Sequence, residues 1–195
     1  MSRTADISRT TGETDIRVSL ALDGSGRGER STGVGFFDHM LDSLARHGGF
    51  DLDVEARGDL QTGSHHTVED TGIVIGQALD EALGDRAGIV RFGNATVPMD
   101  ESRASAAIDI SGRPLCFVQA DLPPVALGGF EPGLAEEFFR GLANNAKLTA
   151  HVWIEVHGDP HHMVEAMFKA FARALRQAVA LDPDVQGVPS TKGLL

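Results

Sequence analysis

The chain has a single cysteine, no apolar run of about 18 residues, and fewer basic than acidic residues. One cysteine, Cys116, excludes a disulfide framework and a thiolate metal site, and it fits a reducing compartment. Without a basic, apolar-cored leader or a membrane span, the chain is predicted to be cytoplasmic. A net charge of −11 argues against nucleic acid or an anionic membrane as partner. Any anionic ligand must therefore be held by a few cationic side chains.

A motif of two adjacent histidines and a glutamate occurs twice. It reads HHTVE at residues 65–69 and HHMVE at residues 161–165. If each motif opens a helix, the glutamate lies on the same side as both histidines. The two imidazoles are then about 100° apart around the helix, so one helix end could supply ligands to two metal ions. A lone pair of histidines is usually a solvated or core pair, but a repeat with identical spacing indicates a metal site.

The repeat extends beyond this motif, which indicates an internally duplicated chain. The 96 positions that separate His65 from His161 also relate apolar residues spaced as on a buried helix face: Val68 and Val164, Ile75 and Phe171, Leu79 and Leu175. Upstream, residues 38–45 align with residues 136–143 at a separation of 98. His39 then corresponds to Glu137, and both residue types are metal ligands.

Both halves show the same order of predicted elements. In the first half we expect a hairpin of strands 16–22 and 29–32, a helix at 36–46, a strand at 50–56, and a helix opened by the histidine pair with Ser64 as N-cap. In the second half we expect strands 104–110 and 115–119, a helix at 134–146, a strand at 148–156, and a helix at 160–180 with Asp159 as N-cap and Pro160 at its first position.

These elements predict an α+β fold, an internally duplicated two-layer sandwich in which each half is a mostly antiparallel sheet with two helices on one face. We expect one unit over residues 1–195. Its repeats should span about 9–92 and 93–185, followed by a C-terminal tail at 186–195 that contributes to the site.

Eight residues are candidate metal ligands, four for each of two ions: His39, His65, His66, Glu69, Glu137, His161, His162 and Glu165. Nitrogen and oxygen ligands without sulfur fit manganese, iron, cobalt or zinc in a near-octahedral geometry. Four protein ligands leave two of six positions open, which is typical of a catalytic site. The protease motifs HExxH and HxxEH are absent. The residues alone leave open a dinuclear metal hydrolase and a non-catalytic metal storage or delivery protein.

Four motifs together resemble those of the imidazoleglycerol-phosphate dehydratase family of histidine biosynthesis: Gly35–Leu41, His65–Thr71, His161–Ala170 and Pro189–Gly193. The resemblance runs from about Arg9 to Leu195. One position departs from the pattern, because many relatives have a histidine where this chain has Glu137. The alignment of Glu137 with His39 keeps it among the expected ligands.

The resemblance implies a carbon–oxygen hydro-lyase that converts D-erythro-imidazole glycerol phosphate to imidazole acetol phosphate. It implies the fold of ribosomal protein S5 domain 2, two Mn²⁺ ions per active site, and a homo-oligomer, commonly a 24-mer of trimers with sites between subunits. The ions would stabilise charge as Lewis acids and orient the imidazole ring of the substrate. The expected partner is therefore a small phosphate ester, with no nucleic acid or membrane.

The resemblance also implies roles for individual residues. The catalytic set is Glu13, His39, His66, Glu69 and Glu165, with Glu13 as the candidate general acid or base. The substrate-binding set is Glu13, His39, His47, His65, Glu69, Arg91, Arg113, His161, Lys169, Ser190 and Lys192, in which the cations bind the phosphate. Each cation could instead be a surface charge, and Lys169 could pair with Glu165 one turn back. His151 is not assigned to metal.

Overall fold

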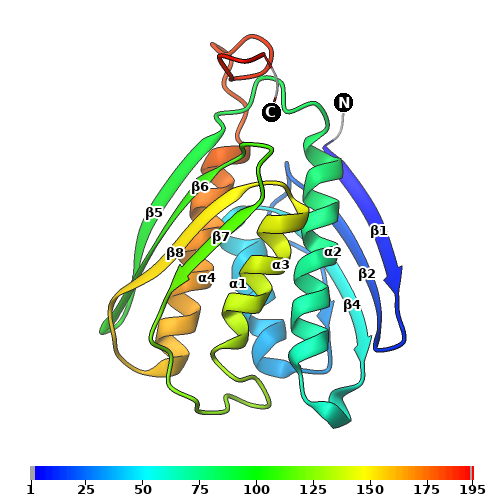
Figure 1. Ribbon diagram of the computed structural model, residues 1–195, viewed down its shortest axis with the longest axis vertical. Helices are drawn as coiled ribbons and strands as arrows, with labels where there is room; N and C mark the ends of the chain where they lie inside the picture. Colours follow the sequence, from blue (N-terminus) through cyan, green and yellow to red (C-terminus); the bar gives the residue numbers. More distant parts are fainter. Residues whose placement is uncertain (1–2, 194) are drawn as a thin grey trace.

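The computed structural model describes residues 3–193 and 195 of the chain. Two sheets enclose a layer of helices (Figure 1). One sheet contains β1 (Thr4–Thr10), β2 (Thr14–Ala21), β3 (Arg30–Ser31) and β4 (Asp51–Gly58). The other contains β5 (Phe92–Met99), β6 (Ser102–Asp109), β7 (Leu115–Gln119) and β8 (Thr149–Val156). The helices are α1 (Gly35–Gly48), η1 (Leu60–Thr62), α2 (His65–Leu83), α3 (Leu134–Asn145) and α4 (Pro160–Val179).

The two sheets have the same connectivity. Their strand orders are β1-β2-β4-β3 and β5-β6-β8-β7. In each sheet the first three of these strands are antiparallel, and the last one pairs in parallel with its neighbour. Inward residues alternate with outward ones, as in β4, where Leu52, Val54 and Ala56 are buried. The predicted α+β fold of two similar, mostly antiparallel halves is confirmed.

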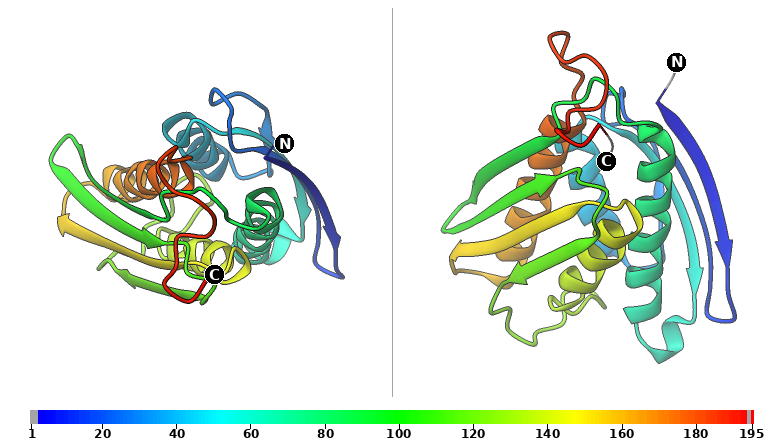
Figure 2. Two further views of the ribbon diagram at one scale, coloured as in Figure 1. Left: turned by 90° about the horizontal axis from the view of Figure 1, so that it is seen from above. Right: turned by 45° about the horizontal axis from the view of Figure 1, so that its top comes forward.

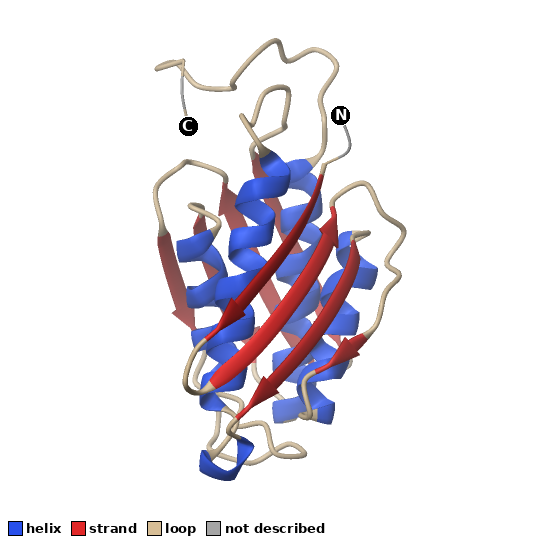
Figure 3. Cartoon of the chain, turned by 90° about the vertical axis from the view of Figure 1, so that its right-hand side faces the viewer, coloured by secondary structure: helices blue, strands red, loops and turns tan. Residues whose placement is uncertain are grey.

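The strands differ from the prediction at the sheet edges. The prediction omits β1 and β5, because each buries a single residue, Ala5 or Gly93, and so carries little hydrophobic alternation. The predicted hairpin between residues 16–22 and 29–32 is wrong. β3 pairs in parallel with β4, whereas β2 lies between β1 and β4 (Figure 3). Hydrophobic pattern alone does not specify which strands become neighbours.

The long helices join the two halves. α2 packs on the first sheet and against α3, while α4 packs on the second sheet and against α1 (Figure 2). The contact between α2 and α3 depends on glycine, because a Cβ atom at Gly72 would lie 2.5 Å from the carbonyl oxygen of Phe138. A Cβ atom at Gly76 would lie 2.5 Å from the carbonyl oxygen of Leu142. The two helix backbones therefore approach more closely than a larger residue permits.

Aromatic residues of the helices form the centre of the shared core. Phe138 of α3 lies with its ring centroid 5.5 Å from that of Phe37 in α1 and 5.0 Å from that of Phe168 in α4. All three side chains are fully buried. Burial of such rings supplies most of the stabilisation of a core, at roughly 2–3 kcal/mol each. None of the helices within residues 3–193 combines the length and apolar composition needed to cross a membrane.

The direction of the helices places the two histidine motifs together at one end of the molecule. α2 and α4 both begin at the lower end in Figure 1, and the segment after α4 lies at the upper end. Helix α4 contains 20 residues, so its ends are about 30 Å apart. Groups near its C-terminus are therefore far from the histidines of the same chain.

Candidate metal centre and substrate site

The second half brings together side chains that could bind a metal ion at the start of α4. His39 of α1 and His161 of α4 lie with their Nε2 atoms 3.6 and 3.2 Å from the carboxylate of Glu165. One potential ligand atom from each of the three residues lies within 4.8 Å of the others. The ring of Phe36 meets that of His161 edge-on at 5.0 Å and supports it. The structure thus joins an early residue, His39, to the later motif.

Glu165 is the buried member of this cluster. Its side chain is 9% exposed and accepts a hydrogen bond from Lys169 Nζ at 2.7 Å. Burial alone would raise the pKa of Glu165, but the hydrogen bond and charge of Lys169, together with His39 and His161, lower it overall. A carboxylate that stays ionised among imidazoles is a suitable ligand for a divalent cation. The alternative contact considered for Lys169, an ion pair with Glu165, is present.

The second histidine of this motif faces a different group. His162 Nδ1 lies 3.0 Å from the carboxylate of Glu101, in the turn between β5 and β6, and its Nε2 atom lies 3.8 Å from Asp100. The three residues have ligand atoms within 4.8 Å of one another. His161 and His162 thus contact different carboxylates, as expected for neighbouring residues that point in different directions around a helix. Asp100 and Glu101 were not predicted from the sequence, because their proximity to His162 depends on where the turn between β5 and β6 lies in the fold.

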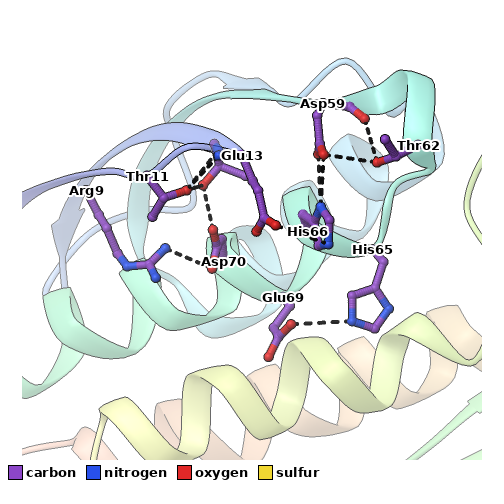
Figure 4. Close-up of polar contacts among 10 residues, drawn as sticks. Arg9, Thr11, Glu13, Asp59, Thr62, His65, His66, Glu69 and Asp70 are labelled. Carbon is purple, nitrogen blue, oxygen red and sulfur yellow. Dashed lines mark hydrogen bonds and ion pairs between the residues drawn. The ribbon is translucent and has the colours of Figure 1, made fainter.

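The first half contains a similar but more open arrangement (Figure 4). His65 Nε2 lies 3.4 Å from the carboxylate of Glu69, and these two side chains are 53% and 43% exposed. His66 Nδ1 lies 3.1 Å from both carboxylate oxygens of Asp59. The hydrogen bond to Asp59 raises the pKa of His66 and lowers that of Asp59. Asp59 was also missed from the sequence.

Glu13 lies where a proton-transfer group could act. Its carboxylate is 3.8 Å from His66 Nε2, and it belongs to the turn between β1 and β2. The turn is anchored to α2, because Thr14 Oγ1 donates to Asp70 at 2.5 Å and Arg9 forms an ion pair with Asp70 at 2.8 Å. The backbone N–H of Glu13 donates to Thr11 Oγ1 at 3.1 Å. A fixed turn therefore holds Glu13 beside a predicted ligand (Figure 4).

Glu137 differs from the other two predicted glutamate ligands because it is paired with an arginine. Both of its carboxylate oxygens accept hydrogen bonds from Arg140 at 2.9 Å. It belongs to none of the three-residue ligand groups found among the described residues. Its equivalence to His39 is retained in the fold, because α3 packs against α2 as α1 packs against α4.

The predicted phosphate-binding cations gather at the opposite end of the helix layer. Arg91 forms two hydrogen bonds with Asp109, at 2.7 and 3.2 Å, and Arg113 lies 3.6 Å from the same carboxylate. Arg91 Nη1 donates to the carbonyl oxygen of Pro189 at 2.8 Å, which brings it beside Ser190 and the tail that carries Lys192. The backbone N–H of Arg91 donates to Ala178, near the end of α4.

These cations are thus separated from the histidines of their own chain. His161 is in the first turn of α4, whereas Arg91 is tied to its last turn, about 25 Å away. Lys169 is the exception, because it lies beside Glu165 in the middle of the helix. The single chain therefore presents the expected site in two parts.

A cavity of about 550 Å³ adjoins the second-half cluster. It is lined by His39, His47, Glu165 and Lys169, and also by Arg46 and other cations of the first half. Burial, with the charges of Lys169 and Arg173, lowers the pKa of His47. His47 therefore lines the same cavity as the predicted ligands His39 and Glu165. His151, in contrast, is exposed and its ring lies 5.5 Å from that of Phe117 on β7.

The donor set fits a divalent metal ion. The second-half cluster offers two imidazole nitrogens and carboxylate oxygens, with no sulfur. The Nε2 atoms of His39, His65 and His161 all face a carboxylate. Such mixed nitrogen and oxygen donors suit first-row metals such as manganese, iron or zinc.

Comparison with known proteins identifies the family. The family model described as Imidazoleglycerol-phosphate dehydratase matches residues 32–175. Relatives of that name from Acetivibrio thermocellus and Symbiobacterium thermophilum are 54% and 56% identical, over 100% and 99% of this chain and 100% and 93% of theirs. The crystal structure of the Staphylococcus aureus protein has 41% identity and a TM-score of 0.83, covering 92% of this chain and 99% of that one.

A second solved structure, of the protein from Pyrococcus furiosus, gives the same TM-score of 0.83 at 39% identity and covers 97% of this chain and 100% of that one. The similarity to these two structures, in both sequence and fold, therefore extends over nearly the whole chain. The family is one of lyases that act as dehydratases. Membership therefore favours a dehydratase over the two alternatives left open by the residues, a dinuclear metal hydrolase and a metal storage or delivery protein. The chain belongs to the imidazoleglycerol-phosphate dehydratase family.

Proposed function

We propose that the protein removes water from D-erythro-imidazole glycerol phosphate to give imidazole acetol phosphate, using two Mn²⁺ ions held by the eight predicted ligands. The reaction would serve histidine biosynthesis in the cytoplasm. The observation that carries the proposal is the convergence of His39, His161 and Glu165 within 4.8 Å in a chain of this dehydratase family. A nitrogen and oxygen donor set that leaves coordination positions open suits catalysis.

We infer that each active site combines residues from more than one copy of the chain, in a 24-mer of trimers. The two histidines of each motif contact different carboxylates, Glu165 and Glu101 in the second half and Glu69 and Asp59 in the first, so we infer that they serve different ions. The predicted phosphate cations lie at the other end of α4 from the histidines. A neighbouring copy could supply what each cluster lacks, and could turn Glu137 from Arg140 towards an ion.

The reaction sets the tasks of the protein groups. The hydroxyl group leaves the carbon attached to the imidazole ring, a proton leaves the next carbon, and the resulting enol rearranges to the ketone. The bound ions would supply Lewis-acid stabilisation of charge on the ring. His39, His65, His161, Glu69 and Glu165 would place the ring, and Glu13 would transfer the proton. The position of Glu13, 3.8 Å from His66, supports this role.

The phosphate group would be bound by Arg91, Arg113, Lys169, Ser190 and Lys192. Arg91 and Arg113 converge on Asp109, and the tail at 186–195 reaches Arg91 through Pro189. Guanidinium groups suit bidentate contacts with phosphate, and lysine adds a point charge. His47 would line the pocket beside Lys169. In this proposal the repeats span about 9–92 and 93–185, and the C-terminal tail completes an active site in another copy of the chain.

The experiment is a comparison of the metal-free and Mn²⁺-loaded protein with imidazole glycerol phosphate and with generic phosphate esters. We expect the metal-free protein to be inactive and the loaded protein to dehydrate imidazole glycerol phosphate alone. Glu13→Gln should retain bound metal and lose about a hundredfold or more in kcat. Ester hydrolysis by the loaded protein would instead indicate a hydrolase, and metal binding without turnover would indicate storage.

Size-exclusion chromatography of the same samples tests the assembly. We expect a large particle with Mn²⁺ that becomes smaller with a chelator, because ligands from different copies would be joined by the ions. His66→Ala and His162→Ala should each lower the metal content. If the particle keeps its size in the presence of the chelator, the metal ions do not hold the assembly together.

A further inference from the structure

The second histidine of each motif is held on one side by a carboxylate that the ligand list does not contain. Asp59 contacts His66 Nδ1 through both oxygens at 3.1 Å. Glu101 contacts His162 Nδ1 through both oxygens, at 3.1 and 3.0 Å. In both cases Nδ1 is engaged and Nε2 faces away from the carboxylate. The two halves thus share the same arrangement of ring and carboxylate.

The two carboxylates come from unrelated positions in the repeat. Asp59 directly follows β4, seven residues before His66, and it lies in the segment that leads into α2. Glu101 is in the turn between β5 and β6, 61 residues before His162. Asp159, which directly precedes α4, is used instead as its N-cap and accepts a hydrogen bond from the backbone N–H of His161. Different elements therefore produce one geometry.

Both carboxylates are themselves fixed in place. Asp59 accepts a hydrogen bond from Thr62 Oγ1 at 3.0 Å. Glu101 accepts a hydrogen bond from the backbone N–H of Asp159 at 2.6 Å. An ionised and immobile carboxylate is a strong acceptor for an imidazole N–H.

We propose that Asp59 and Glu101 are positioning residues, which keep the proton of His66 and His162 on Nδ1 and aim the unprotonated Nε2 at a metal ion. In neutral imidazole only one nitrogen carries a proton, so an acceptor at Nδ1 leaves the lone pair on Nε2. The Nε2 atoms lie 3.8 Å from Glu13 and Asp100, respectively, a distance that leaves them without a direct hydrogen bond. This inference rests on the proposed metal-dependent function.

The test is a calorimetric titration of the full-length, metal-free protein with Mn²⁺. Asp59→Ala and Glu101→Ala should each weaken binding by about 10- to 100-fold, which is typical for loss of a partner that orients a ligand. Asp59→Asn and Glu101→Gln keep an oxygen acceptor and should give intermediate losses. Matched controls are Asp15→Asn and Glu155→Gln, whose carboxylates contact Thr10 and Ser105 with Arg103 rather than a histidine. Both controls should bind Mn²⁺ like the unaltered protein.

A spectroscopic measurement separates positioning from general structural support. In ¹⁵N NMR spectra of the metal-free protein, His66 and His162 should show the tautomer protonated at Nδ1. Each alanine variant should lose this signature at its own histidine only, while Glu101→Gln keeps an acceptor for the backbone of Asp159 and should unfold at an unchanged temperature.

The outcomes distinguish this inference from the proposed function. If the unaltered protein binds no Mn²⁺, the metal-dependent function fails. If it binds Mn²⁺ and the alanine variants bind equally well, or if the two histidines are protonated at Nε2, the positioning role is wrong. Weaker binding with a changed tautomer supports it.

Discussion

The two repeats hold their glutamates in different environments. Glu165 is 9% exposed and contacts His39, His161 and Lys169, whereas Glu69 is 43% exposed and contacts His65. The helix ends that carry the motifs are nevertheless alike, with histidine and glutamate 3.2 and 3.4 Å apart. The comparison indicates that duplication retained the ligand geometry and that the surroundings diverged. The second-half cluster is largely assembled within one chain, and the first-half cluster is open.

The largest expected difference between the repeats is in the two glutamates. Glu165→Gln and Glu69→Gln should each lower kcat/KM about a thousandfold, because a lost metal ligand removes several kcal/mol of transition-state stabilisation. Only Glu165→Gln should also destabilise the metal-free protein, by about 1–3 kcal/mol, since Lys169 is 17% exposed and loses its partner. Steady-state kinetics and thermal unfolding measure the two effects.

Glu136→Gln serves as the control, because its carboxylate is in an exposed pair with Arg140. It should change neither quantity appreciably. Equal stability losses for the Glu165 and Glu69 variants would contradict the difference in burial between the repeats.

A smaller effect is expected where the repeats pack differently. Gly72 of α2 aligns with Phe168 of α4, and a Cβ atom at Gly72 would lie 2.5 Å from the carbonyl oxygen of Phe138. Gly72→Ala should lower the free energy of unfolding by about 1–3 kcal/mol through overpacking, despite the better helix propensity of alanine. The unfolding temperature should fall by roughly 3–10 °C.

Gly133→Ala is the matched control, since a Cβ atom there meets no neighbour within 4 Å. It should leave the unfolding temperature nearly unchanged. If Gly72→Ala leaves the unfolding temperature unchanged, α2 and α3 can move apart without a loss in the free energy of unfolding.

The smallest expected effect concerns the starts of α2 and α4. Asp159 caps α4 by accepting from the backbone N–H of His161 at 2.9 Å, whereas Ser64, at the equivalent place, donates to the carbonyl oxygen of Gly129 at 2.8 Å. Asp159→Ala should cost about 1 kcal/mol and accelerate amide hydrogen exchange at His161. Ser64→Ala should leave the first amides of α2 unaffected. Faster exchange there would show that Ser64 caps α2 in solution.

These helix starts also show what sequence can predict. The repeated HHxxE spacing correctly placed two helices with their histidines in the first turn, because periodicity and spacing are local properties. Both Asp159 and Ser64 were predicted as caps. The prediction for Asp159 is correct, whereas the Ser64 hydroxyl does not cap α2 because it donates to the carbonyl oxygen of a residue 65 positions away. Local capping patterns do not reveal a competing partner from another part of the chain.

Long-range partners account for most of what was missed. Asp59 and Glu101 contact the second histidines from positions that share no motif, and β3 joins β4 in parallel rather than the preceding strand. Conversely, the cations that we predicted together as a phosphate site are separated in one chain, because Arg91 is tied to the far end of α4 whereas Lys169 lies beside Glu165. A motif indicates which side chains serve one chemistry and does not specify which copy supplies them.

The distance between the two ends of α4 has a genetic consequence. Under the proposed assembly, a subunit defective at Arg91 and another defective at His162 would carry lesions in different parts of each composite site. Particles reassembled from a mixture of the two would contain some sites built entirely from intact parts. Two alleles that are each inactive alone would then complement one another when expressed together.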